Sequence, residues 1–121
     1  MASCRISPQA ERDIDAILQW THESFGEKAR LRYEALLIQA IEDVATDPNR
    51  AGSHDRSEIA PDDRTYHLRF SRDRVKKSIK KVQRPRHFLL YRRASDGGIE
   101  IARMLHDGMD LERHLPDDYR L

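Results

Sequence analysis

The sequence contains few of the residue types that identify several common protein classes. It has one cysteine, so it cannot form an internal disulfide, and we expect a reducing, cytoplasmic location. Its six histidines lack the H-x3-H and H-E-x-x-H spacings of zinc sites, so we expect no metal. No apolar run approaches the length of a membrane span, and the N-terminus has no signal-peptide pattern. The chain length predicts a single domain over residues 1–121.

Motifs for bound cofactors and for nucleophilic catalysis are absent as well. The chain has no G-x-x-x-x-G-K, G-x-G-x-x-G or G-x-S-x-G sequence and no usable pair of cysteine and histidine. These motifs supply phosphate cradles, dinucleotide sites and activated nucleophiles. The sequence therefore predicts no cofactor, and it does not support an enzyme that hydrolyses nucleotides or transfers electrons or acyl groups.

What the sequence does contain is a strong asymmetry of charge. The formal net charge is only +1, yet residues 64–93 hold 12 of the 22 Lys and Arg and one acid, Asp73. That segment is therefore +11, and the rest of the chain sums to −10. Such a concentration favours a polyanionic partner, either nucleic acid or an acidic protein segment. The alternative is a basic face that contacts only solvent.

Nine basic side chains in this segment are the candidate binding residues. No aromatic residue is interleaved between residues 71 and 86, so this surface would hold phosphates or carboxylates by charge and would not read bases. The nine are Arg69, Arg72, Arg74, Lys76, Lys77, Lys80, Lys81, Arg84 and Arg86.

The first half of the chain predicts two amphipathic helices joined by a short turn. Ser7 can cap the first helix with its hydroxyl group, and Pro8 suits the first helical position. Apolar residues then recur with helical spacing until the pattern breaks at residues 22–26. A second apolar stripe runs from about Glu27 to Thr46, and Asp47-Pro48 ends it. We expect the two helices to form an antiparallel hairpin.

The second half predicts strands. Residues 49–63 are polar and predict a loop, whereas residues 65–70 alternate as a half-buried strand does. Residues 87–92 form an apolar and aromatic run that suits a buried strand. Asp96-Gly97-Gly98 supplies a turn, and residues 99–106 form the return strand of a hairpin.

The connection between these strands predicts one more helix. Within residues 71–86, Val75, Ile79 and Val82 recur with helical spacing among basic side chains, which predicts a short basic amphipathic helix. The fold class is therefore α+β: a small, mainly antiparallel β-sheet packed against an N-terminal α-helical hairpin, with an extra short basic helix between strands. Neither long helix can bury its apolar stripe alone, so the sheet must receive both.

The last third of the chain carries a family pattern. A strand ending in Tyr91-Arg92 is followed by a short turn and by residues 99–106, which read I-x-I-x-R-x-L-H, with Asp110 four residues later. This pattern and the helical hairpin resemble the RelE/ParE family of toxins from type II toxin–antitoxin systems, and ParE-like members more closely. The resemblance also implies a first strand at Arg5-Ile6-Ser7.

The resemblance implies a function as well. A ParE-like toxin inhibits DNA gyrase and is neutralised by a cognate antitoxin encoded beside it, as in plasmid stabilization modules. The nine basic residues would then form the surface for the target or for an acidic antitoxin tail. The alternative is a RelE-like endoribonuclease that cuts mRNA on the ribosome without a metal. A module that has lost its toxicity and only binds antitoxin is a third reading.

The two activities differ in the residues that they need. Cleavage of RNA requires a base, an acid and positive charge on the phosphate, so an endoribonuclease would use His106 as acid or base. Arg103 or Arg92 would hold the phosphate. A gyrase inhibitor needs no catalytic residue, and His106 would then be structural, bonded to a carbonyl or to Asp110.

Four further residues have simpler interpretations. Asp107 and Asp110 could suggest a metal, but Asp110 is better explained as the N-cap of a last helical turn over residues 111–115. Tyr119 lies in an acidic stretch that would repel RNA, so we assign it no role. Trp20 follows the apolar stripe of the first helix, and we expect it at the edge of the core.

Overall fold

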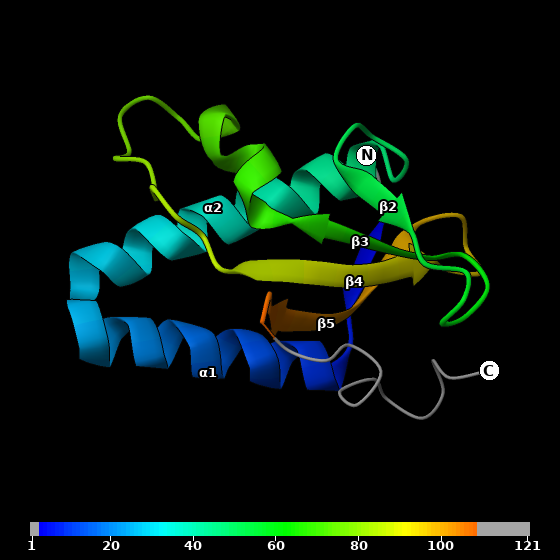
Figure 1. The fold of residues 1–121 in the computed structure, drawn as a ribbon, viewed down its shortest axis with the longest axis horizontal. Helices are drawn as coiled ribbons and strands as arrows, with labels where there is room; N and C mark the ends of the chain where they lie inside the picture. Colours follow the sequence, from blue (N-terminus) through cyan, green and yellow to red (C-terminus); the bar gives the residue numbers. More distant parts are fainter. Residues whose placement is uncertain (1–2, 109–121) are drawn as a thin grey trace.

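The structure, a computed structural model, describes residues 3–108 of the chain. Figure 1 shows two long helices packed side by side along a five-stranded sheet. In chain order the elements are β1 (Cys4–Ile6), α1 (Pro8–Phe25), α2 (Glu27–Thr46), β2 (Ser53–Asp55), β3 (Asp63–His67), the 3-10 helix η1 (Leu68–Arg74), β4 (His87–Arg93) and β5 (Ile99–His106). None of the helices described is long and apolar enough to cross a membrane.

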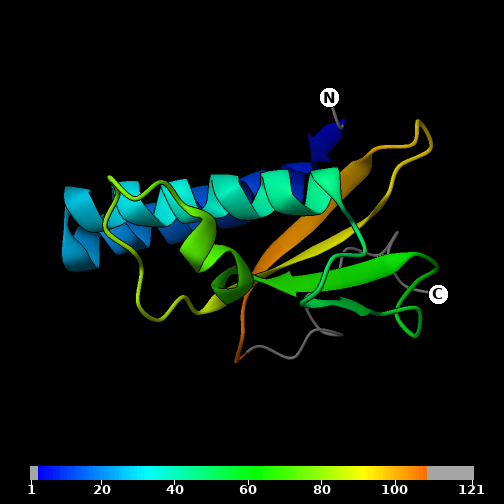
Figure 2. The same cartoon turned by 90° about the horizontal axis from the view of Figure 1, so that it is seen from above.

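The sheet is mixed but mostly antiparallel. Its strands lie in the order β1-β5-β4-β3-β2. β1 pairs with β5 in parallel, whereas the other three pairs are antiparallel. Figure 2 shows that both long helices cover the same face of this sheet. The predicted α+β fold with an N-terminal helical hairpin is therefore confirmed.

Ser7 joins the first strand to the first helix. Its Oγ accepts a hydrogen bond from the N–H of Ala10 at 3.0 Å and donates one to the carbonyl of Ala102 at 2.7 Å. Its own N–H donates to the carbonyl of Ile101 at 3.0 Å. One residue thus caps α1 and holds its N-terminus against β5, and the predicted cap is confirmed.

The core lies between α2 and the sheet. α2 has the predicted bounds, and its apolar stripe is buried, with Leu36 at 1 % and Ala40 at 0 % exposure. These residues belong to one cluster with Tyr66 of β3 and Leu89 of β4. Burying a large apolar side chain contributes roughly 1.5–3 kcal/mol, so this interface is the main source of stability.

The predicted strand over residues 65–70 is wrong at its end. β3 stops at His67, and the chain then turns into η1. The Nδ1 atom of His67 accepts a hydrogen bond at 3.1 Å from the backbone N–H two residues on, which caps η1. In the middle of η1, Ser71 Oγ donates to the buried carboxylate of Asp43 on α2 at 2.6 Å. These contacts outweigh the alternating pattern of the sequence.

The predicted basic helix over residues 71–86 is displaced. A short basic helix does lie between two strands, but it is η1, and residues 75–86 contain no helix. A helix there would place Lys76 beside Lys80, and Lys77 beside Lys81, and like charges at this spacing are unfavourable. The three residues of the predicted stripe still pack on the core, from a loop: Val75, Ile79 and Val82.

Three smaller predictions need correction. Residues 49–63, predicted as a loop, contain the short edge strand β2, whose polar residues show no apolar alternation. α1 continues through residues 22–25 and ends at Gly26, where φ is +95° and glycine is favoured. Trp20 is 57 % exposed and does not lie at the edge of the core.

The carboxyl group of Asp63, at the start of β3, is buried without a hydrogen bond. The residue is 0 % exposed, and neither oxygen has a hydrogen-bond partner within the described part of the chain. Burial raises the pKa of Asp63 to about 7, although the charge of Arg92 acts in the opposite direction. Asp63 is therefore mostly neutral in mildly acidic solution.

We expect the free energy of unfolding to fall as Asp63 ionises. Its pKa of about 7 in the native state exceeds the ordinary value of 3.8, so the native state binds the proton more tightly. Stability is therefore lost as the pH rises toward 7, by up to about 1.4 kcal/mol per pH unit. Urea denaturation of the wild type and of Asp63→Asn between pH 5 and pH 8 measures the loss as the difference between the two proteins, because His87 contributes a slope of the opposite sign below about pH 6.5. Asp63→Asn should remove this component, and an unchanged slope in that variant would contradict the assignment.

Candidate functional site

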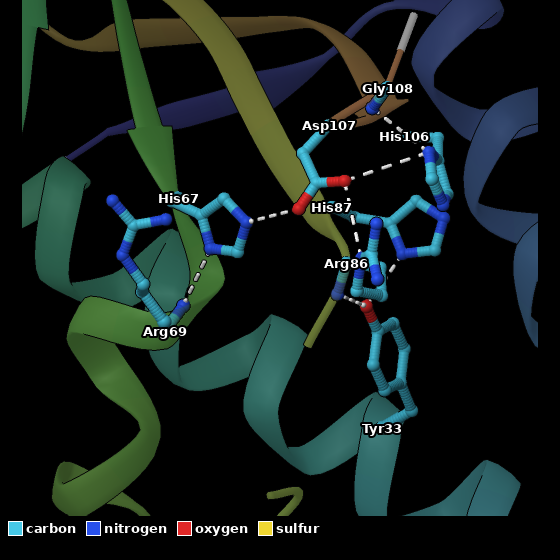
Figure 3. Close-up of polar contacts among 8 residues, drawn as sticks. All are labelled: Tyr33, His67, Arg69, Arg86, His87, His106, Asp107 and Gly108. Carbon is cyan, nitrogen blue, oxygen red and sulfur yellow. Dashed lines mark hydrogen bonds and ion pairs between the residues drawn. The ribbon is translucent and has the colours of Figure 1, made fainter. Parts of the chain in front are cut away.

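Three histidines meet at one end of the sheet. His67 ends β3, His87 begins β4 and His106 ends β5. Because these neighbouring strands are antiparallel, the end of one lies beside the start of the next, and His87 and His106 are direct partners in the register. Figure 3 shows the three rings with Tyr33 of α2 and with Arg86 and Asp107, which flank the strands. We call these six residues the histidine cluster.

Asp107 connects most of the cluster. Its Oδ2 lies 3.1 Å from His67 Nε2, and its Oδ1 accepts a hydrogen bond from Arg86 Nε at 3.3 Å (Figure 3). The same Oδ1 lies 3.6 Å from His106 Nδ1. Burial favours a higher pKa for Asp107, but the hydrogen bonds from His67 and Arg86 outweigh it and lower the pKa below the ordinary value. Asp107 is thus an ionised acceptor for the imidazole of His67 and the guanidinium of Arg86, and the His106 ring lies beside it.

Tyr33 and His87 form the buried side of the cluster. The Tyr33 hydroxyl oxygen accepts a hydrogen bond from the N–H of Arg86 at 3.2 Å and lies 2.5 Å from His87 Nδ1. The tyrosine proton is therefore available to His87 Nδ1. Burial lowers the pKa of His87 to about 4, and the neighbouring His106 adds to this effect. Burial also raises the pKa of Tyr33 to about 12, so both groups stay neutral at physiological pH.

His106 is the histidine that reaches solvent. Its side chain is 44 % exposed, and its ring lies edge-on to that of His87 with centroids 5.4 Å apart. Its Nδ1 accepts a hydrogen bond from the N–H of Gly108 at 3.0 Å. An Nδ1 that accepts leaves the ring proton on Nε2 in the neutral form.

A groove begins at this cluster and extends along the helical hairpin. Its volume is about 750 Å³, and it lies between α1, the start of α2 and residues 80–87. Trp20 and Phe25 line it, 57 % and 67 % exposed, with ring centroids 5.6 Å apart in an edge-to-face arrangement. His87 and His106 line its inner end. Its basic edge consists of Arg32, Lys80, Lys81, Arg84 and Arg86.

Comparison with known proteins gives a family. Residues 4–111 match the family described as "ParE toxin of type II toxin-antitoxin system, parDE". The chain belongs to this family. Toxin ParE1 of Mycobacterium tuberculosis, in strain CDC 1551 / Oshkosh and in strain ATCC 25618 / H37Rv, is 26 % identical over 110 residues. The alignment covers 91 % of this chain and 94 % of each relative. Membership in the ParE family implies an antitoxin partner.

In this ParE-family toxin the structure separates the residues that we predicted for RNA cleavage. Arg103 forms a two-pronged ion pair with Asp13 of α1, with Nε and Nη2 at 2.7 and 2.9 Å from the two carboxylate oxygens. Arg92 lies opposite Glu100, at the other end of β4 from His106. His106 therefore has neither arginine beside it, and its neighbours are His87, Arg86 and Asp107. Asp110 and Tyr119 lie outside the described residues.

The nine predicted basic residues do not form one uniform surface. Five have described partners: Arg74 pairs with Asp43, Arg72 and Lys81 pair with Asp73, Arg86 pairs with Asp107, and Arg69 lies 4.7 Å from the Phe70 ring centroid. The other four are exposed and form no ion pair within residues 3–108: Lys76, Lys77, Lys80 and Arg84. Lys80 and Arg84 line the groove, whereas Lys76 and Lys77 do not.

The sequence prediction did not include His67, His87, Tyr33 or the groove. His87 and His106 stand at predicted strand ends, and the antiparallel order of those two strands is a signal that could have grouped them. His67 lies inside the strand predicted over residues 65–70, so this signal does not extend to it. Trp20 and Phe25 gave no such signal, because their exposure depends on how the hairpin lies on the sheet. Within residues 3–108, no group of three or more His, Cys, Asp or Glu is placed to hold a metal ion.

We expect acidification to destabilise the toxin through His87. Its pKa of about 4 in the native state lies below the ordinary 6.5, so the unfolded state binds the proton more tightly. The stabilisation is complete above about pH 6.5 and is lost as the pH falls toward 4. NMR titration of the ring protons should show His87 neutral down to about pH 5. Protonation of His87 near pH 6.5 would contradict the burial argument.

We expect Arg103 to stabilise the fold through Asp13. Arg103→Lys keeps the charge but loses the two-pronged geometry, and it should lower the free energy of unfolding by about 1–3 kcal/mol. Asp13→Asn should have a similar effect, and the double variant should be less destabilised than the sum of the two. Urea denaturation of the four proteins measures the coupling. Strictly additive losses would show that the pair contributes no interaction energy.

Proposed function

We propose that this protein is the toxin of a type II toxin–antitoxin module, that its target is DNA gyrase and that a cognate antitoxin neutralises it. Membership in the ParE family and the relatives named Toxin ParE1 support the toxin assignment. On this proposal the protein acts in the cytoplasm, and its module serves in plasmid stabilization. Inhibition of gyrase is a binding activity, and it requires no catalytic residue.

The observation that favours gyrase over the ribosome is the position of Arg103. An endoribonuclease needs a cation on the scissile phosphate beside its acid and base. Arg103 is held by Asp13, and its side chain is only 18 % exposed. Arg92 stands at the far end of β4. Neither of the predicted phosphate-binding arginines is therefore available next to His106.

The charge of the chain supports an acidic antitoxin segment. Lys76, Lys77, Lys80 and Arg84 are exposed and form no ion pair in the described region. A partner that brings carboxylates to these cations gains complementary charge and a faster encounter. We propose that the antitoxin covers part of this basic surface.

One observation favours the alternative of a RelE-like endoribonuclease. Asp107 lies within 3.1 Å of His67 and 3.6 Å of His106, and it also binds Arg86. Two imidazoles beside one guanidinium are groups that can act as acid, base and phosphate ligand. In that case His106 would be catalytic and Arg86 would replace Arg103 in the predicted set. The target would be mRNA on the ribosome.

A supercoiling assay with purified gyrase tests the proposal. We expect the toxin to inhibit supercoiling and, after treatment with SDS, to leave linear DNA from trapped cleavage complexes. His106→Ala should largely retain this inhibition, because the proposed activity uses no general acid or base. Normal supercoiling in the presence of the folded wild-type toxin would remove gyrase as the target. Loss of toxicity in a folded His106→Ala variant would instead support RNA cleavage.

A further inference from the structure

We propose that the groove beside the helical hairpin is the surface that grips the toxin's target, and that it takes an acidic protein segment presenting large apolar side chains. This inference rests on the proposed inhibition of gyrase, and it assigns that activity to a place on the molecule. The occupant is identified by two features of the groove, which are its exposed aromatic residues and its one-sided charge.

The aromatic pair gives the first argument. Trp20 is 57 % exposed and Phe25 is 67 % exposed, and both line the same hollow of about 750 Å³. Ile17 and Val82 add apolar surface to the groove. Exposed apolar clusters of this kind mark interaction sites, and aromatic residues contribute a large share of binding energy at protein interfaces. A partner that inserts large apolar side chains would remove this surface from water.

Charge gives the second argument. Among the described residues that line the groove, five are Arg or Lys, two are His and none is Asp or Glu. Lys80 and Arg84 are exposed there without an ion pair in the described chain, so carboxylates can reach them. At the inner end, His106 and Arg86 also face the groove. The groove therefore selects an acidic occupant.

The combination of the two features favours a peptide over a nucleic acid. A duplex presents phosphates but has no apolar side chains to cover the aromatic pair. A single strand could stack a base on a ring face that the edge-to-face contact leaves free, but the groove offers one pair of neighbouring rings and no row of aromatic residues for successive bases. An amphipathic segment supplies carboxylates and apolar side chains together, which is how such segments bind grooves.

Residues 75–86, which connect η1 to β4 and carry all of the basic edge except Arg32, are fixed at both ends. The 3-10 helix before them is held by Asp43, which accepts hydrogen bonds from Ser71 at 2.6 Å and from Arg74 at 3.0 Å. At the other end, the N–H of Arg86 donates to Tyr33 at 3.2 Å. Figures 1 and 2 show the connection extending past the sheet toward the turn of the hairpin. The groove is thus organised before its occupant arrives, which reduces the entropy cost of binding.

The chain provides its own probe, because Trp20 is its single tryptophan. Toxin labelled with 5-fluorotryptophan should give one fluorine NMR resonance, from a residue inside the groove. Adding purified gyrase should shift this signal, as the ring moves from water into an interface, whereas binding elsewhere on the toxin should broaden it without a shift. A synthetic acidic peptide with leucines on one helical face should shift the signal too, whereas the same peptide with lysine in place of each glutamate should not.

Two pairs of variants separate the groove from general effects. Lys80→Glu with Arg84→Glu should raise the toxin concentration needed to inhibit gyrase at least about tenfold. Arg12→Glu with Arg93→Glu, an equal charge change at two exposed residues outside the groove, should leave it nearly unchanged. Phe25→Ala should also weaken inhibition at least about tenfold, and Ile38→Ala, which removes a 50 % exposed apolar side chain of α2, should not. Circular dichroism confirms that each variant folds.

The outcomes distinguish this inference from the proposed function. Failure of the wild-type toxin to inhibit gyrase would overturn the gyrase assignment and the groove inference with it. Inhibition by the wild type and by the groove variants at equal concentration, with a fluorine signal that does not shift, would overturn the groove inference alone. A signal shifted by a single-stranded oligonucleotide but not by gyrase would also overturn it and assign the groove to nucleic acid.

Discussion

The buried carboxylate of Asp43 determines where the basic segment of this toxin lies. It is 3 % exposed, and it receives hydrogen bonds from Gln39 on its own helix, from Ser71 and from Arg74. A buried charge is stable only when its hydrogen-bonding capacity is used, so these partners are required. Their positions end β3 early and hold η1 on α2. The next residues then leave the sheet toward the hairpin turn, and the cations of the groove lie on this path.

Asp13 and Asp63 show how hydrogen-bond donors determine the role of a carboxyl group in this fold. Asp13 receives two hydrogen bonds from Arg103 and one from the N–H of Met104 at 3.0 Å, and in this way it ties α1 to β5. Asp63 is more deeply buried than Asp13, at 0 % against 16 % exposure, but it receives no hydrogen bond from the described chain, and its pKa rises to about 7. The same side chain therefore acts as a structural anion where donors surround it and becomes a neutral acid where they do not.

The sequence predicted those parts of the fold that local chemistry decides. Ser7 and Pro8 begin α1, Asp47-Pro48 follows the end of α2, and the Gly97-Gly98 turn joins β4 to β5, each through interactions of neighbouring residues. The predicted secondary structure is wrong where contacts between residues far apart in the sequence determine it. β3 ends at His67 because of Asp43, which is 24 positions away, and three-residue β2 exists only by pairing with β3. The same holds for the candidate site. The sequence pattern identified His106 as a candidate, whereas the residues around it are determined by the order of the strands in the sheet.

The arrangement of the groove also bears on how a toxin of this family can be neutralised. A small inhibitor that acts by binding has little surface to divide between target and antitoxin. The exposed aromatic pair and the two exposed groove cations that form no ion pair among residues 3–108, Lys80 and Arg84, lie in one groove. Any acidic antitoxin segment attracted by the same cations would approach the same place. If the groove grips the target, an antitoxin that covers it neutralises the toxin by exclusion, and no change in the toxin's fold is needed.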